Sequence, residues 1–512
     1  MISEELKRLC AGLGPVGESA PEETGPYVSV EQLTGRFAAL YEKLRTLVDY
    51  KEYHVIRRSA IRRMLKRRLY IERTPNAAGK ALLRELVISG YLPNNKVPEA
   101  KGQQLHHIIH KWTVFQQEGL SISESLDFAS IEIEQFLFRD PLKEAVAESF
   151  FAAALGAVVY QRKDRVDSTL ITYAACRRSL LSEDKPGLLY ALLVRGVPEV
   201  TANGQTDPLL SVLAQRVIAS LRASEAIATH PLVWKVSARL KNHSLYYAVL
   251  LEIFYSYGKE AESILGEEEK LSEVTRSIIE KKQRQQRKLL KSSGKRAVIY
   301  LLLTKIILGV SLEWPYEHFI LHASNYLALG TNAFFHPLLL FLMVTFVSKE
   351  QKGVQRVVDG VSAVVHGKEM KQIFIHPPVG ATTFFFVLCF YVLLFAVSFG
   401  LILWALIAIN FNVVSIILFF VFLTLVSYFG IRIRGSAKRW EPAREKPGTL
   451  GLVWNLFTFP IVNTGRWFSV RFSSINVFVL LLDFLVEMPF KAFLGVFDAS
   501  LAFIKEHRVD TY

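Results

Sequence analysis

The sequence predicts an all-α, polytopic helical membrane protein with a cytoplasmic α-helical domain on its N-terminal side. Three observations carry this prediction. The mean hydropathy is +0.25 although the formal net charge is +14. Charged residues crowd the first 296 positions and apolar runs crowd the rest, and convincing alternating strands are absent. A chain with an apolar half and a basic half needs a separate solvent for each half, which favours one membrane part and one aqueous part.

The first 26 residues lack both the apolar core of a signal peptide and the Arg-rich pattern of a transit peptide. We therefore expect a disordered tail over residues 1–26. The cysteines Cys10, Cys176 and Cys389 lie far apart without metal-ligand spacing. This spacing predicts neither a disulfide framework nor a zinc ribbon, and a reducing compartment for the N-terminal part. No metal site and no cofactor are expected.

Residues 27–266 are predicted to form the cytoplasmic helical domain. Two helices are expected to start where Asp precedes Pro, at Asp140–Pro141 and at Asp207–Pro208. Asp caps the free N–H groups of a first turn, and Pro fits the first helical position because that position needs no N–H.

The stretch "VIRRSAIRRMLKRRLYIER", residues 55–73, carries eight Arg or Lys residues against one acid. At helical spacing the bases form a stripe opposite an apolar face. The candidate residues are Arg57, Arg58, Arg62, Arg63, Lys66, Arg67 and Arg68. We interpret the stripe as a site for anionic lipid headgroups or an acidic partner. The alternative is a solvated outer face of a bundle helix, and nucleic acid is not expected because no recognised motif accompanies the stripe.

The stretch "LHHIIHKW" places His106 and His110 one helical turn apart. Zinc requires at least a third protein ligand, and the Glu of a zincin motif is replaced here by His107. We therefore expect ordinary surface or core histidines.

Residues 267–296 are predicted to form a charged stalk helix that leads to the membrane. Its acids come first and its bases last, an order that suits the helix dipole and the anionic cytoplasmic leaflet.

A four-helix transmembrane region is predicted over residues 297–431, because a span needs roughly 20 apolar residues. The expected spans are about 297–313, 332–347, 379–409 and 413–431. Lys and Arg residues flank alternate ends of these spans. They are Arg284, Arg287, Lys288, Lys291, Lys295 and Arg296, then Lys349, Lys352, Arg356, Lys368 and Lys371, then Arg432, Arg434, Lys438, Arg439, Arg444 and Lys446. The positive-inside rule therefore predicts a multi-pass protein of the cell (inner or plasma) membrane with both termini cytoplasmic.

Residues 432–512 are expected to form a basic loop followed by amphipathic or re-entrant C-terminal helices. Within 475–497, Asp483, Glu487 and Lys491 are spaced by four residues and share one helix face. Such a stripe favours a helix in the membrane interface, and a fifth span is the alternative.

Ionisable residues inside the apolar region predict a polar site. Lys305 lies about 13 Å past Arg296 along a helix, and an unpaired charge at that depth costs a few kcal/mol. The candidate residues of this intramembrane site, for an ion, a proton or a lipid headgroup, are Lys305, Glu313, His336, Asp483 and Glu487. The alternative is that Lys305 makes one structural ion pair.

No phosphate loop, dinucleotide fingerprint, nucleophile elbow or di-iron cluster is present. The sequence therefore favours a membrane anchor or scaffold over an enzyme. Its helical domain is expected to bind a cytoplasmic protein partner or lipid headgroups, and the chain is expected to form a homo-oligomer. The alternatives are a small-solute or ion transporter or channel that uses Lys305, and a lipid-processing membrane enzyme.

Overall fold

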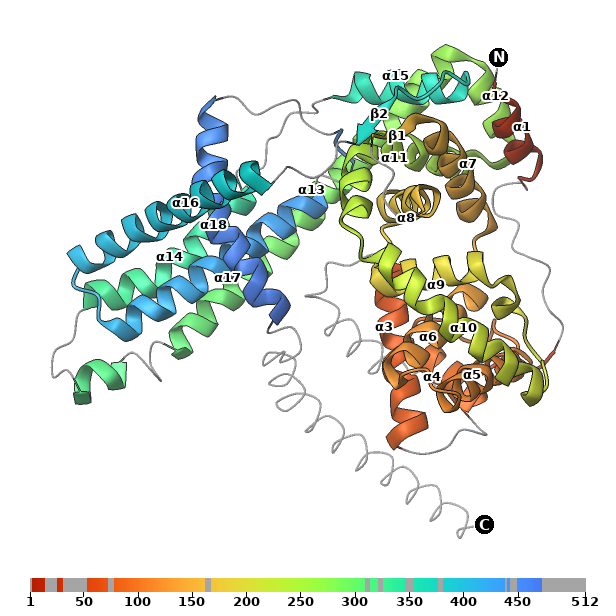
Figure 1. Cartoon of the computed structure of the whole chain (residues 1–512), viewed down its shortest axis with the longest axis horizontal. Helices are drawn as coiled ribbons and strands as arrows, with labels where there is room; N and C mark the ends of the chain where they lie inside the picture. Colours follow the sequence, from red (N-terminus) through yellow and green to blue (C-terminus); the bar gives the residue numbers. More distant parts are fainter. Residues whose placement is uncertain are drawn as a thin grey trace, which may run out of the picture. The chain divides into compact units, whose positions relative to one another are not determined.

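The computed structural model divides the chain into two compact units (Figure 1). We call the first unit the α-domain; it comprises Met1–Ser293, Ser348–Gly380 and Gly435–Glu445. We call the second the apolar bundle; it comprises Gly294–Val347, Ala381–Arg434 and Lys446–Tyr512. The residues that the structure describes are 2–13, 25–30, 53–71, 78–161, 167–308, 314–320, 326–345, 353–375, 381–437, 440–442 and 449–471.

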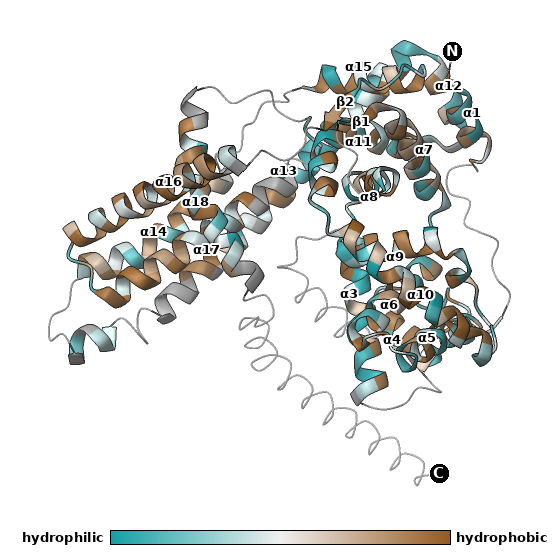
Figure 2. Cartoon of the chain, in the orientation of Figure 1, coloured by the Kyte–Doolittle hydropathy of each residue, from teal (hydrophilic) through white to brown (hydrophobic). Residues whose placement is uncertain are grey.

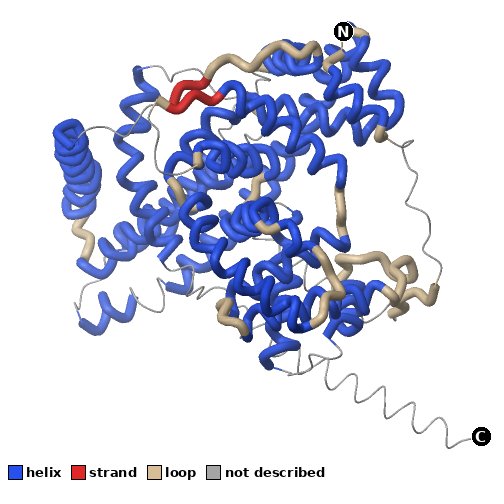
Figure 3. Tube along the Cα trace, turned by 45° about the vertical axis from the view of Figure 1, so that its right-hand side comes forward, coloured by secondary structure: helices blue, strands red, loops and turns tan. Residues whose placement is uncertain are grey.

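The described part of the α-domain is almost entirely helical, as Figure 3 shows, which confirms the all-α prediction. Its helices up to residue 181 are α1 (Glu4–Ala11), α3 (Tyr53–Lys66), the π-helix η1 (Arg67–Ile71), α4 (Ala78–Ile88), α5 (Lys101–Gln117), α6 (Ile122–Leu137), α7 (Pro141–Ala157) and α8 (Ser168–Leu181). The following ones are α9 (Lys185–Gly196), η2 (Pro198–Thr201), α10 (Asp207–Ala228), α11 (Pro231–Tyr257), η3 (Gly258–Glu260), α12 (Ala261–Gly266), α13 (Glu268–Leu308) and α15 (Val354–Val365).

Local capping fixes where several of these helices begin. Asp140 caps α7 by accepting a hydrogen bond from Lys143 N, and Pro141 is the first helical residue, as the sequence predicted. At the second Asp–Pro pair, α10 begins one residue earlier than predicted. Thr206 is the N-cap, and Asp207 is the first helical residue. Its carboxylate faces a histidine of α5 instead of the helix N–H groups.

Aromatic side chains fill the core between α5, α6 and α9. The Trp112 ring lies 5.1 Å from Phe115 and 5.3 Å from Phe128, between ring centroids, and Tyr190 of α9 completes the cluster. All four are 2 % exposed or less. Aromatic packing of this kind adds to the free energy gained from their buried area.

The N-terminal tail departs from the expected disorder. Residues Glu4–Ala11 form α1, whose Leu6 and Cys10 are buried in the core of the α-domain, and Ser3 N donates to Val365 O at 2.9 Å. Two apolar residues one turn apart give the helix a face to bury. The prediction of disorder is wrong for these residues.

The segment Ser348–Gly380 adds a helix and a strand to the α-domain. Val357, Val361 and Val365 of α15 are buried at helical spacing, and α15 packs on α11. Strand β2 (Ile373–Ile375) pairs in parallel with β1 (Val158–Tyr160). A strand pair so distant in sequence has no local signal, and the sequence did not predict it.

The segment Gly435–Glu445 also lies on the α-domain. Gln283 of α13 donates to Trp440 O at 3.0 Å, and Lys282 lies 5.2 Å from the centroid of the Trp440 ring. Pro442 contacts Gly353, where the backbone φ is +81° and a Cβ would collide with the proline ring. Both segments that return from the apolar bundle therefore meet on the α-domain.

The predicted stalk is part of one longer helix. α13 runs without interruption from Glu268 to Leu308, so the stalk and the described part of the first predicted span are continuous. Residues 309–313 lie outside the described part.

The described helices of the apolar bundle beyond α13 are η5 (Tyr316–Ile320), α14 (Tyr326–Thr345), α16 (Ala381–Ala408), α17 (Val413–Ala437) and α18 (Thr449–Arg471). Within the described residues, the stretches Tyr326–Met343, Phe385–Ala408 and Val413–Ile431 are long and apolar enough to cross a membrane. They overlap the second, third and fourth predicted spans, and most of their residues have the brown colour of hydrophobic residues in Figure 2. The C-terminal segment 475–497 lies outside the described residues.

Small residues let the bundle helices approach closely. A Cβ on Gly465 of α18 would collide with the backbone of Thr424 in α17, and one on Gly430 of α17 would collide with Met343 of α14. Close backbone approach at glycine is common in helices that pack in lipid.

The crossing of α4 and α5 depends on Gly79. A Cβ at this position would overlap the carbonyl of Gly102 and the backbone of His106. We expect Gly79→Ala to lower the free energy of unfolding by about 1–3 kcal/mol, because backbone atoms have to shift. The measurement is urea unfolding of the detergent-solubilised protein, followed by far-UV circular dichroism.

Gly156→Ala is the matched control, since nothing lies within 4 Å of a Cβ there and the residue is helical. It should raise stability by up to about 1 kcal/mol, because Ala favours the helix over Gly. If Gly79→Ala and Gly156→Ala change the free energy of unfolding equally, close packing of α4 on α5 at Gly79 is contradicted.

Candidate functional site

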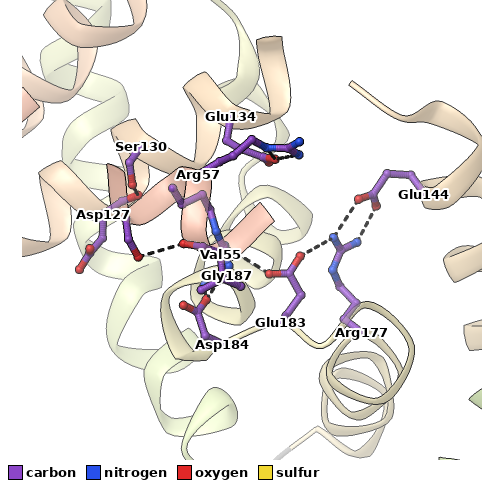
Figure 4. A network of polar contacts seen from close by, with 12 residues as sticks. Val55, Arg57, Asp127, Ser130, Glu134, Glu144, Arg177, Glu183, Asp184 and Gly187 are labelled. Carbon is purple, nitrogen blue, oxygen red and sulfur yellow. Dashed lines mark hydrogen bonds and ion pairs between the residues drawn. The ribbon is translucent and has the colours of Figure 1, made fainter. Parts of the chain in front are cut away.

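The arginines of α3 lie against carboxylates of the same domain (Figure 4). Arg57 pairs with Glu134 of α6 and stacks over the Phe138 ring at 4.0 Å. Arg58, which is 5 % exposed, donates to Asp184 at 2.8 Å and to Glu183 at 3.3 Å in the turn between α8 and α9. Buried guanidinium groups require partners of this kind.

A second arginine extends this network to α7. Arg177 of α8 makes two hydrogen bonds to Glu144, at 2.7 and 3.0 Å, and lies 3.5 Å from Glu183. Burial by itself raises the pKa of Glu144, but the hydrogen bonds and charge of Arg177 lower it overall. Burial raises the pKa of Glu134 despite its contact with Arg57.

The remaining bases of the predicted stripe lie nearby. Arg62 pairs with Asp127 at 2.5 Å, while Arg67 and Arg68 both pair with Glu85 of α4. Arg63 is half-buried, and Lys66 is exposed. Five of the seven candidate bases thus have carboxylate partners inside the domain. Ion pairs inside the domain therefore neutralise most of the basic stripe, an arrangement that differs from both the predicted lipid or partner site and the solvated face.

His54 lies within this cationic cluster. Burial, followed by the charges of Lys143, Arg58, Arg57 and Arg177, lowers its pKa to about 3. Its Nε2 is buried without a hydrogen-bond partner. The imidazole is therefore neutral at physiological pH.

A separate buried ion pair joins α5 to α6. Lys111, 1 % exposed, donates to Glu132 at 2.6 Å, to Val200 O at 2.5 Å and to Asn203 Oδ1 at 2.9 Å. The second oxygen of Glu132 accepts from Trp112 Nε1 at 2.7 Å. Burial lowers the pKa of Lys111 and raises that of Glu132, because desolvation opposes each charged form. Closed on all sides by protein, this pair links helices and gives no access to a substrate.

The histidines of α5 remain a small cluster. His106 and His110 stack with centroids 6.3 Å apart, and His110 Nε2 lies 2.8 Å from Asp207 Oδ1. In the described part of the chain, no group of three His, Cys, Asp or Glu residues is arranged to hold a metal ion. The cluster links α5 to α10.

The apolar bundle contains a buried polar contact between α14 and α17. Asn332 donates to Ser415 O at 3.4 Å, and His336 Nε2 donates to Phe419 O at 2.9 Å. Both contacts join residues 83 positions apart, so the two helices run in the same direction. Asn332 and His336 are completely buried.

Of the five residues predicted for an intramembrane site, His336 is the one whose side chain the structure describes. It lies against helix carbonyls. Lys305 belongs to α13, while its side chain, together with Glu313, Asp483 and Glu487, lies outside the described residues. The structure therefore gives His336 a helix-packing position and leaves the predicted cluster untested.

Comparison of the chain with protein-family models, with curated proteins and with solved structures finds no match.

The buried pair yields a stability prediction. Lys111→Met should lower the free energy of unfolding by about 3–5 kcal/mol, because Glu132 is left buried without its cation. Lys185→Met, which breaks an exposed pair with Glu225, should cost no more than about 1 kcal/mol. Urea unfolding measures both. The double variant Lys111→Met/Glu132→Gln should be more stable than Lys111→Met alone, because it removes the unpaired buried charge. If the double variant is no more stable, the unpaired charge of Glu132 is not the cause of the lost stability.

His54 yields a pH prediction. Its pKa is about 3 in the folded protein against an ordinary 6.5, so the unfolded chain binds the extra proton. Stability is complete above pH 6.5 and falls, at up to about 1.4 kcal/mol per pH unit, as the pH drops toward 3. His54→Gln should flatten this dependence in urea unfolding measured from pH 7 downward. Parallel curves for the two proteins would show that His54 does not titrate in this way.

Proposed function

We propose that the protein is a multi-pass membrane scaffold that holds the α-domain at the cytoplasmic face and presents it to a binding partner. One observation carries the proposal. The α-domain incorporates the two segments, Ser348–Gly380 and Gly435–Glu445, that follow apolar helices. These are the segments that the Lys and Arg distribution assigns to the cytoplasm.

The arrangement of the apolar helices agrees with this topology. With the N-terminal side cytoplasmic, alternate crossings make α14 and α17 run in the same direction across the membrane. The two contacts offset by 83 residues require that same direction. The joining segments assigned to the outside, 314–331 and 410–412, belong to the apolar bundle and carry no Lys or Arg.

The described polar groups of the bundle support an anchoring role. Besides the contacts of Asn332 and His336, Ser398 Oγ of α16 donates to Phe457 O of α18 at 3.0 Å. Polar side chains that bond backbone carbonyls of neighbouring helices stabilise helix association in lipid. A transport pathway would instead require polar groups facing a hydrated cavity.

Site-directed labelling tests the topology. In a Cys389→Ala background, where Cys10 and Cys176 are buried, we expect Tyr326→Cys to react with a membrane-impermeant maleimide in intact cells. Tyr326 is 76 % exposed and lies within 314–331, a segment assigned to the outside. Lys368→Cys, in the segment assigned to the cytoplasm, should react only after the membrane is permeabilised.

The background protein without added cysteines controls for leakage and for the buried thiols. Reaction of Lys368→Cys in intact cells would reverse the proposed orientation. Recovery of the protein in the soluble fraction after carbonate extraction would refute the membrane scaffold itself.

A further inference from the structure

The outer face of α13 carries a row of bases that the α-domain does not neutralise in the way that it neutralises the arginines of α3. Lys281, Arg284, Lys288 and Lys291 follow the spacing i, i+3, i+7, i+10, and all four are exposed. At about 100° per residue, they point within an arc of about 80°. We call these four residues the α13 row, which is about 15 Å long at 1.5 Å per residue.

The other side of α13 holds the row in place. Ile279, Gln283 and Leu290 are each 5 % exposed or less and lie away from the row on the helix. Lys282 pairs with Glu252 of α11. The helix is therefore packed on the α-domain, and the bases of the row are arranged before any ligand binds, which lowers the entropic cost of binding.

Most of the charge of the α13 row has no partner inside the domain. After Glu280 the sequence contains no acidic residue until Glu313. Arg284 pairs with Glu280 one turn earlier, at 3.1 Å, and its side chain stays 72 % exposed. Within the described residues, none of the other three bases has a carboxylate within ion-pair distance. These three charges, spread over about three helical turns, are available to a ligand.

The residues before the row limit where an acidic ligand can lie. Ser277 and Glu273 continue the same face toward the start of α13, one and two turns before Lys281, and both are exposed. The face thus changes from an acid, through a neutral residue, to four bases. A ligand that slid along α13 toward Glu273 would meet a like charge, and repulsion of this kind fixes the register of a complex.

We propose that the α13 row binds an acidic helix of a partner protein that carries one carboxylate per turn along one face. The inference rests on the proposed scaffold function and names the chemistry of its partner. Helices that lie side by side repeat their facing side chains every three or four residues, so carboxylates at that spacing meet the bases one to one. Charged residues that flank the contact between paired helices set partner choice in the same way. Because the pairs are exposed, the contact is weak and sensitive to salt.

A partner helix fits the row better than a lipid surface does. A lipid surface is broad and would meet the whole outer face of α13, including the exposed carboxylate of Glu273. A helix of about three turns covers the bases alone. The regular spacing of the row matches the fixed spacing of side chains on a helix, whereas lipid headgroups diffuse and have no fixed spacing.

The first test uses the full chain in phosphatidylcholine nanodiscs. The probe is a fluorescein-labelled, Ala-rich synthetic peptide with Glu at every third or fourth position, so that its carboxylates share one helix face, and fluorescence anisotropy measures binding. We expect saturable binding that weakens as the salt concentration rises. A peptide of the same composition with its Glu residues distributed around the helix should bind at least fivefold more weakly. Equal binding of the two peptides would overturn the proposed match between helices.

The second test reverses charges of the row. Lys288→Glu/Lys291→Glu should weaken binding of the Glu peptide at least tenfold, because two attractive contacts become repulsive. A peptide with Lys in place of Glu should bind this variant more tightly than it binds the unchanged protein, a gain that loss of folding could not produce. Far-UV circular dichroism and thermal unfolding confirm that each variant is folded.

The matched control is Arg239→Glu/Lys241→Glu in α11, which makes the same change of net charge. Both residues are exposed but point about 160° apart, so they form no row, and binding should change less than twofold. Equal weakening by both double variants would show a net-charge effect and overturn the assignment. Absence of peptide binding, with row-dependent binding to phosphatidylserine vesicles, would replace the partner helix by lipid. The labelling result is independent of peptide binding, so failure of this inference leaves the proposed topology standing.

Discussion

The α-domain packs as it does because the arginines of α3 cannot be buried without carboxylates. Arg58 is almost completely buried, and desolvating a guanidinium without a partner would cost several kcal/mol. Its contacts with Glu183 and Asp184 fix the turn between α8 and α9 against α3. Asp184 also caps α9 through Gly187 N. One carboxylate therefore neutralises a charge and starts a helix, so tertiary packing and local structure depend on the same group.

Charge is distributed differently in the apolar bundle. Its helices α14, α16 and α17 contain no acidic residue, so polar side chains there depend on backbone carbonyls. Asn332 and His336 reach the carbonyls of Ser415 and Phe419 from the neighbouring helix. Such contacts satisfy a donor without placing a charge in a low-dielectric medium. The same physical requirement, that buried polar groups have partners, thus gives ion pairs in one unit and neutral hydrogen bonds in the other.

Local signals in the sequence were sufficient for the all-α class, the apolar helices and the start of α7, because hydrophobic periodicity and capping act within a few residues. Local signals did not predict contacts between residues that lie far apart in the sequence. Glu183 is 125 residues from Arg58, and β2 is more than 200 residues from β1. A basic stripe looks the same from sequence whether solvent, lipid or remote carboxylates neutralise it.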